Sequence, residues 1–234
     1  GGQSLFLSEK DIQLGRGEPI TDSAIVISSM VDAIMLRMSS HEDIVEFSKY
    51  SSKPVINALS DESHPCQILA DLMTYQEHRG PIEGKKIAWI GDGCNVCQTY
   101  MQAASLFDFE LTIATPSGYG PSDAFIKKYQ KNISFFDDPN KACKDADIVI
   151  TDVWTSMGQE SEIKQRETAF KGFQVDQKMM NQAKDDAIFM HCLPAYRGKE
   201  VSSGVIDGKQ SVVWSEAENR LHVQKSLLLY LIED

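Results

Sequence analysis

The sequence predicts an α/β fold with parallel strands, divided into two domains. From residue 84 onward, short apolar runs alternate with segments whose apolar residues recur at helical spacing. This alternation is typical of βαβ units and therefore of a parallel sheet. A glycine- and proline-containing segment at 80–84 separates it from a less regular first third. The 234 residues are enough for two modest domains.

In the first third, capping residues and apolar spacing define the elements. Ser40 can cap a helix whose apolar positions fall on one face. Pro65 suits the first turn of a helix, and Gly80 can end one. The expected elements are an irregular segment over 1–23, a strand over 24–28, a helix over 30–38, a helix from Ser40, a strand over 54–57 and a long helix from His64-Pro65 to Gly80.

After the boundary the elements follow one another regularly. The expected strands are 86–90, 111–114, 133–136, 147–151, 187–190 and 211–214. The expected helices are 95–107, 122–130, a short one around Lys141, 162–169, 176–183 and 216–232. Right-handed crossovers place the turns that follow parallel strands on one edge of the sheet, where open α/β proteins bind ligands. We therefore expect the turns at 91–95, 152–158 and 191–198 to meet.

Composition restricts the partners and the compartment. A net charge of −11 argues against a nucleic-acid partner, which needs a face rich in lysine and arginine. No apolar run approaches the roughly 20 residues that span a bilayer, and no secretory signal is visible. The five cysteines show no disulfide framework, so reduced thiols in the cytoplasm are expected.

The stretch from His191 to Gly198 follows a buried strand and carries a histidine, a thiol, a proline and an arginine in one turn. Each of these residues taken singly is more often part of an ordinary strand-to-loop turn with a buried cysteine. Three further polar turns, at 64–67, 92–95 and 152–158, favour a functional role for the set.

The turn Gly91-Asp92-Gly93-Cys94-Asn95 lies between a strand and a helix. It is not a dinucleotide fingerprint, because Val96 occupies the sixth position and no acidic residue ends the next strand. A plain strand-to-helix turn explains the glycines. Cys94 and Cys97 allow two other interpretations: a redox pair at a helix N-terminus, or half of a zinc site completed by His191 and Cys192.

Two more turns carry residues suited to polar ligands. In the stretch 151–158, Asp152 and the hydroxyls after it suit a ligand ammonium group, although a helix cap explains them equally well. His64 and Gln67 lie on the first turn of a helix, where neutral donors can polarise a carbonyl group. Arg37 and Arg220 are candidate anion clamps, or else surface ion-pair residues.

Taken together, these turns resemble the transcarbamylase family, and within it the enzymes that use ornithine. The resemblance covers essentially the whole chain. The matching segments are His64-Pro-Cys-Gln67, Gly91-Asp-Gly-x-Asn95, Asp152-Val-Trp-Thr-Ser-Met-Gly158, His191-Cys-Leu-Pro194 and Glu216-Ala-Glu-Asn-Arg220. Several motifs in the right order are far more specific than any one of them. The Ser-Met-Gly segment points to ornithine as the amine acceptor.

The resemblance implies an enzyme of arginine metabolism. It would transfer a carbamoyl group from carbamoyl phosphate to the δ-amine of L-ornithine, giving citrulline and phosphate, without a metal or an organic cofactor. The residues implied to hold carbamoyl phosphate are Arg37, His64, Gln67 and Arg220. Those implied to hold the α-amino and α-carboxylate groups of ornithine are Asn95, Asp152, Ser156 and Met157. Cys192 and Leu193 would lie against the reacting amine.

The resemblance also implies two parallel-sheet αβα domains and a homotrimer. The first domain would comprise residues 1–83 with the final helix, 217–234, packed on it, and the second residues 84–216. Two departures stand out. Cys94 occupies a position where the family commonly has asparagine, and the family's Ser-x-Arg-Thr phosphate motif occurs nowhere in the sequence. We therefore expect a truncated first domain and a chain that is weakly active or inactive.

Three alternatives remain open at this point. The chain could be a non-catalytic amino-acid-binding module, or a transcarbamylase with another amine acceptor. It could also be a thiol oxidoreductase that uses Cys94 and Cys97.

Overall fold

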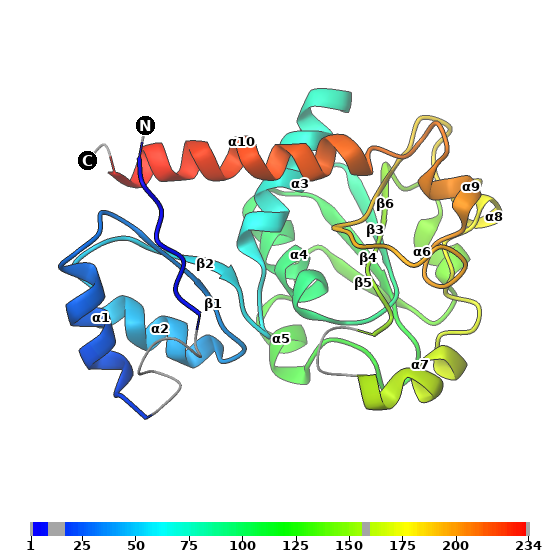
Figure 1. Ribbon diagram of the computed structural model, residues 1–234. Coiled ribbons are helices and arrows are strands. Elements are labelled where there is room, and N and C mark those ends of the chain that lie inside the picture. Colours follow the sequence, from blue (N-terminus) through cyan, green and yellow to red (C-terminus); the bar gives the residue numbers. More distant parts are fainter. Residues whose placement is uncertain (1, 9–16, 156–159, 233–234) are drawn as a thin grey trace. The chain divides into compact units, whose positions relative to one another are not determined.

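The computed structural model describes residues 2–8, 17–155 and 160–232 (Figure 1). The chain divides into two compact units, which are treated separately here: residues 1–61 with 225–234, and residues 62–224. In the described part of the chain, no helix combines the length and the apolar character needed to span a bilayer.

The first unit is a small α/β arrangement. Its elements are α1 (Ile20–Ser28), β1 (Ile34–Arg37), α2 (His41–Tyr50) and β2 (Val55–Leu59). β1 and β2 pair in parallel, with Ile34 opposite Val55. The buried side chains of Ala24, Ile34 and Phe47 form its core. The predicted cap is confirmed, because the Ser40 hydroxyl accepts a hydrogen bond from the amide of Asp43 at 3.1 Å.

Two predictions in this unit are wrong. Residues 24–28 belong to a helix and not to a strand, because Ile20, Ala24 and Ile27 recur at helical spacing and all pack on the unit's core. The helix expected over 30–38 is replaced by β1, in which Ile34 and Leu36 alternate toward that core. The N-terminal segment expected to be irregular ends at α1, which begins at Ile20.

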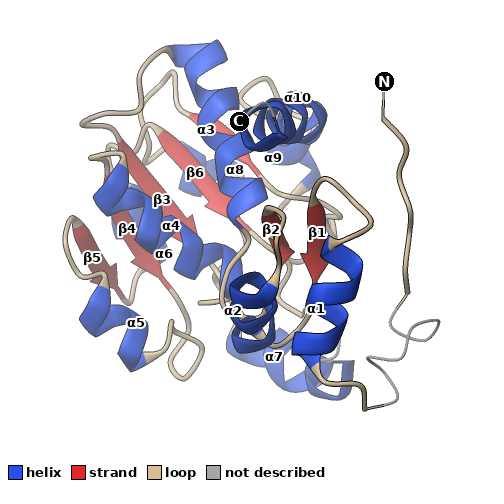
Figure 2. Cartoon of the chain, turned by 90° about the vertical axis from the view of Figure 1, so that its left-hand side faces the viewer, coloured by secondary structure: helices blue, strands red, loops and turns tan. Residues whose placement is uncertain are grey.

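The second unit confirms the predicted parallel sheet. Its strands are β3 (Lys86–Ile90), β4 (Glu110–Ala114), β5 (Ile133–Phe136), β6 (Ile148–Thr151) and β7 (Ile188–Met190). They run in the order β5-β4-β3-β6-β7, and every pair is parallel (Figure 2). The chain builds outward from β3 through β4 to β5 and then crosses back to β6. The strand order therefore reverses between β3 and β6, where such sheets bind ligands.

Helices cover both faces of this sheet. The described helices are α3 (Pro65–Arg79), α4 (Asn95–Leu106), α5 (Asp123–Lys128), α6 (Pro139–Cys143), a 3₁₀ turn at Glu160–Glu162, α7 (Ile163–Ala169), α8 (Gln177–Met180), α9 (Ser203–Ile206) and α10 (Val213–Ile232). β3 shows the two faces by alternation. Ile87 and Trp89 pack with α3 and α4, whereas Ala88 and Ile90 pack on the opposite side.

The strand predicted over 211–214 is wrong. Ser211 forms only an isolated bridge to Phe189, and α10 begins at Val213. Val212 and Val213 are β-branched and apolar, which favours a strand. In the structure both side chains are buried at the start of α10. The compact units separate near residue 61, since Ile68 and Tyr75 of α3 pack in the same core as α4. The domain boundary expected near residue 83 stays a prediction.

Candidate active site

The turn after β3 is fixed by close packing. Gly91 has φ +130°, and a Cβ there would lie 3.2 Å from the Thr151 hydroxyl. A Cβ on Gly93 would lie 2.2 Å from the backbone nitrogen of Pro121, so only glycine fits. The amide of Gly93 also donates to the carbonyl of Tyr119 at 2.7 Å. These glycines thus serve backbone packing, as the interpretation of a plain strand-to-helix turn requires.

Asp92 in the same turn is a functional candidate that the sequence did not reveal. Its carboxylate forms a buried ion pair with Arg166 of α7 at 2.9 Å. Arg166 also donates to the carbonyl of Trp154 and lies over the ring of Tyr119. Burial raises the pKa of Asp92 to about 6, although Arg166 opposes the shift. The ion pair therefore ties the turn after β3 to the turn after β6.

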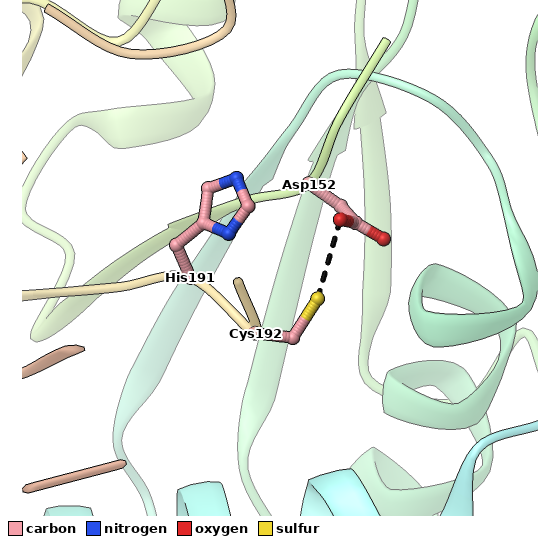
Figure 3. A group of neighbouring side chains, drawn as sticks. All are labelled: Asp152, His191 and Cys192. Atoms are coloured by element: carbon pink, nitrogen blue, oxygen red, sulfur yellow. Dashed lines mark hydrogen bonds between the residues drawn. The ribbon is translucent and has the colours of Figure 1, made fainter. Parts of the chain in front are cut away.

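Asp152 ends β6 and meets two thiols. The Cys192 thiol donates to one carboxylate oxygen at 3.2 Å (Figure 3). The Cys94 thiol approaches the other oxygen at 3.7 Å. Asp152 is buried, with 7% of its surface exposed. Burial, and after it the charge of Asp152, raises the pKa of both thiols well above the ordinary value. Both cysteines therefore remain protonated at neutral pH.

Protonated thiols argue against the redox interpretation, which needs a thiolate. Cys97 of α4 is fully buried in the core, where burial also raises its pKa well above the ordinary value. Among the described residues, Asp152, His191 and Cys192 offer possible ligand atoms within 4.8 Å of one another. Both ring nitrogens of His191 are already engaged by protein groups, however. We therefore assign no metal to this group.

His191 organises the turn that follows β7. Its Nδ1 accepts a hydrogen bond from the amide of Leu193 at 2.9 Å, so its Nε2 carries the proton and faces Glu200 at 3.3 Å. The carboxylate of Glu200 also accepts from the amide of Tyr196. Leu193 has φ +57°, and the Leu193–Pro194 peptide is cis. His191 is completely buried, so it fixes the conformation of the turn from the protein interior. Cys192 and Leu193, which are partly exposed, are the residues of this turn that a ligand could reach.

Gln67 and Arg220 meet directly at the start of α3. The guanidinium group of Arg220 donates to the Gln67 side-chain carbonyl at 2.6 Å. The amide nitrogen of Gln67 donates to Asp71 at 2.8 Å and to Glu216 at 3.1 Å. The sequence pointed to Gln67 and Arg220 but assigned no role to the two acids. Glu216 is separated from Gln67 by 149 residues, so local pattern does not reveal this contact.

Hydrogen bonds connect most of the predicted site residues within the second unit. The backbone amide of His64 donates to the Thr99 hydroxyl, which donates to the carbonyl of Asn95. Glu216 accepts from the amide of His191, directly before Cys192. Hydrogen bonds form three groups, which are joined where His191 precedes Cys192 and Cys94 precedes Asn95 in the chain. The predicted residues in this combined network are His64, Gln67, Asn95, Asp152, Cys192 and Arg220, with Leu193 in the adjoining turn.

Three predicted residues stand apart from this network. Arg37 lies exposed at the end of β1, in the other compact unit. Ser156 and Met157 lie outside the described residues. Their roles stay predictions.

The fold and this network define a class of protein: an α/β protein with a small-molecule site at the strand-order reversal of a parallel sheet. Two family models match the chain. The Asp/Orn binding domain of aspartate/ornithine carbamoyltransferase matches residues 83–231, and the carbamoyl-P binding domain matches residues 1–77. The chain therefore belongs to the aspartate/ornithine carbamoyltransferase family and is a transferase.

Individual proteins similar to this chain are ornithine carbamoyltransferases, in agreement with the family models. The chain is 66% identical over 232 residues to the ornithine carbamoyltransferase of Ruthia magnifica, covering 99% of this chain and 78% of that protein. It is 57% identical to that of Nitrosococcus oceani, covering 99% and 76%. The crystal structure of ornithine carbamoyltransferase from Burkholderia thailandensis superposes with a TM-score of 0.91 at 53% identity, covering 99% and 76%. The structure of ornithine carbamoyltransferase from Pyrococcus furiosus superposes with a TM-score of 0.92 at 48% identity, covering 98% of this chain and 75% of that one.

Proposed function

We propose that this chain transfers the carbamoyl group of carbamoyl phosphate to the δ-amine of L-ornithine, giving L-citrulline and phosphate. The observation that carries the proposal is the hydrogen-bond network linking Gln67 and Arg220 to Asp152 and Cys192. It connects donors suited to an anionic, carbonyl-bearing substrate with an acid suited to an ammonium group. The relatives named ornithine carbamoyltransferase supply the choice of substrates.

In this proposal the reaction begins with the placement of carbamoyl phosphate. Arg220 supplies positive charge to the phosphate, and the role expected of Arg37 stays a prediction. His64 and Gln67 lie at the start of α3, whose N-terminus favours developing negative charge. As the amine attacks, charge develops on the carbonyl oxygen, and donors already in place stabilise it. The bond between the carbamoyl carbon and the phosphate oxygen then breaks, and phosphate leaves as hydrogen phosphate with the proton that the amine loses.

Ornithine is held by the opposite side of the network. Asp152 and Asn95 bind its α-amino and α-carboxylate groups, and Ser156 and Met157 contribute to the same end. The turn at Cys192 and Leu193 lies against the side chain and guides the neutral δ-amine toward the carbamoyl carbon. Holding two reactants in this geometry supplies much of the rate enhancement without covalent catalysis. The thiols stay protonated and serve as hydrogen-bond donors, not as nucleophiles.

The proposal includes the family's biological setting: arginine metabolism, the cytoplasm and a homotrimer, without metal or organic cofactor. Size-exclusion chromatography with light scattering tests the trimer. Activity in metal-free buffer tests the absence of a metal requirement.

The decisive experiment measures citrulline formation and ornithine binding on the same preparation. Transfer from carbamoyl phosphate is followed as the carbamoylated product formed with ornithine, putrescine or aspartate as acceptor, with Asp152→Asn as the test variant. We expect product from ornithine alone, at a low rate because the sequence contains no Ser-x-Arg-Thr phosphate motif, and a further large loss in the variant. Calorimetry should show ornithine binding that strengthens when carbamoyl phosphate is present. Ornithine binding without turnover would favour the non-catalytic amino-acid-binding alternative, and absence of both would refute the proposal.

A further inference from the structure

Two carboxylic acids are buried against each other beneath the site. Asp71 comes from α3 and Glu216 from the first turn of α10, and their exposed fractions are 4% and 1%. Both accept hydrogen bonds from the same amide nitrogen of Gln67, at 2.8 and 3.1 Å. The two carboxyl groups also lie close enough to hydrogen-bond to each other.

This geometry does not suit two negative charges. The nearest cation is Arg220, and its guanidinium group is hydrogen-bonded to Gln67. Two neighbouring carboxylates with so little compensation relieve their repulsion by sharing one proton. Burial, followed by the charge of Asp71, raises the pKa of Glu216 well above its ordinary range, whereas burial brings that of Asp71 to about 6. The two carboxyl groups therefore titrate as one unit that holds a proton at neutral pH.

Every oxygen of the pair has a partner. One oxygen of Asp71 accepts from the hydroxyl of Tyr100 at 2.6 Å and the other from Gln67. One oxygen of Glu216 accepts from Gln67 and the other from the backbone amide of His191 at 2.9 Å. The pair is thus fixed to α3, to α4 and to the turn that carries Cys192.

The arrangement also fixes which way the Gln67 amide faces. Two acceptors on its nitrogen side and the Arg220 donor on its oxygen side allow one orientation only. A rotated amide would direct its nitrogen at Arg220 and its oxygen at two acids. The pair therefore selects the group that Gln67 presents to its neighbours.

We propose that Asp71 and Glu216 are positioning residues: as one proton-sharing unit they hold the Gln67 amide and the start of the turn at His191 in a fixed mutual register. The inference rests on the proposed function for its consequence, because Gln67 belongs to the carbamoyl phosphate side and Cys192 to the ornithine side. The unit ties these two sides together through the protein interior.

Other titratable groups face the pair from each neighbouring element. Tyr100 faces it from α4, Arg220 from α10, and Cys192 from the turn after β7, while Cys66 of α3 faces Arg220. Burial, followed by the charge of Asp71, raises the pKa of Tyr100 well above its ordinary value, so Tyr100 remains a donor.

The test compares Glu216→Gln with Glu216→Ala in the full 234-residue chain. The glutamine imitates the protonated acid toward two of its three partners, since its oxygen can accept from His191 and its nitrogen can donate to Asp71. Its nitrogen cannot accept from Gln67, which keeps its own hydrogen bond to Asp71. Alanine removes both contacts and leaves the buried amide of His191 unpaired, a change worth about tenfold or more in an equilibrium. Glu218→Gln is the matched control, because Glu218 lies on the same helix with its side chain 73% exposed.

Two readouts need no turnover. The infrared difference between the parent chain and Glu216→Gln at pH 7 should contain the C=O band of a protonated carboxyl group, which Glu218→Gln should not remove. Alkylation of Cys192, followed by mass spectrometry, should accelerate about tenfold in Glu216→Ala and stay unchanged in Glu216→Gln. The absence of the band, or equal alkylation in both variants, would overturn the proposal.

Kinetics then test the consequence. We expect Glu216→Gln to keep kcat and the KM for ornithine within about twofold, and Glu216→Ala to lose about tenfold in kcat/KM for ornithine. A glutamine variant as impaired as the alanine variant would contradict a proton-sharing unit. If the proposed function itself fails, no chain forms citrulline, yet the infrared band and the alkylation rates still decide the structural claim.

Discussion

Replacing Arg166 with methionine should expose how strongly the buried ion pair with Asp92 supports the site. The two side chains are 8% and 9% exposed and meet at 2.9 Å. Methionine fills much of the volume but leaves Asp92 without a counter-charge. Breaking a buried pair from one side costs about 3–5 kcal/mol. We therefore expect the free energy of unfolding at pH 8 to fall by about that amount.

The pH dependence separates charge from packing. Burial raises the pKa of Asp92 from 3.8 to about 6 in spite of Arg166, so loss of the arginine raises it further. At pH 5 the variant's Asp92 is neutral, and the remaining cost is that of the unpaired Trp154 carbonyl, about 1–3 kcal/mol. In the parent chain, protonation of Asp92 favours folding. That contribution is complete below 3.8 and is lost as the pH rises through about 6.

The assay is urea denaturation followed by circular dichroism and tryptophan fluorescence at both pH values. The double variant Asp92→Asn, Arg166→Met should recover part of the loss at pH 8, because no buried charge remains. Lys199→Met serves as the control: its pair with Glu167 is exposed and should contribute less than about 1 kcal/mol. An equal loss at pH 5 and pH 8 would refute the electrostatic explanation and assign the effect to packing.

Three further predictions can each be checked by one measurement. Gly93→Ala places a Cβ within 2.2 Å of the Pro121 backbone and should lower the free energy of unfolding by about 3 kcal/mol; a loss below 1 kcal/mol by denaturation would show that the loop yields. Ser40→Ala should cost about 1 kcal/mol in the same assay, whereas Ser48→Ala, which removes no cap, should cost less. Cys94 and Cys97 should resist iodoacetamide at pH 6.5, because burial raises both thiol pKa values; rapid labelling by mass spectrometry would restore the redox interpretation.

The regular part of the fold followed from the sequence because its signals are local. Each strand from β3 to β7 is a short apolar run between turn residues, and parallel pairing follows from the helices between them. The first unit misled the same reasoning. Ile25, Val26 and Ile27 are apolar and β-branched, yet they belong to a helix whose Ile20 and Ala24 contact the unit's core. A nine-residue segment cannot by itself distinguish the helical period of about 3.6 residues from the strand period of about 2. Packing against the rest of the unit selects the helix.

The candidate site was predictable where a motif marked it. Gln67, Asp152 and Cys192 were found from turns at strand ends and helix starts, and the network joins them. Asp71 and Arg166 were not found. Each lies inside a helix, among residues whose spacing gives no sign of a partner, and each partner is distant along the chain. Such buried polar pairs become visible only when the fold brings them together.

The contact between Gly93 and the Pro121 backbone has a consequence for motion. The Gly93 amide also donates a hydrogen bond to the Tyr119 carbonyl. The loop at 116–121 and the turn after β3 are therefore held together as one rigid segment at the strand ends. A ligand arriving there meets a surface that already has its final shape, and little ordering entropy is lost on that side. Amide hydrogen exchange at Gly93 should accordingly be among the slowest of any loop residue, with or without substrates.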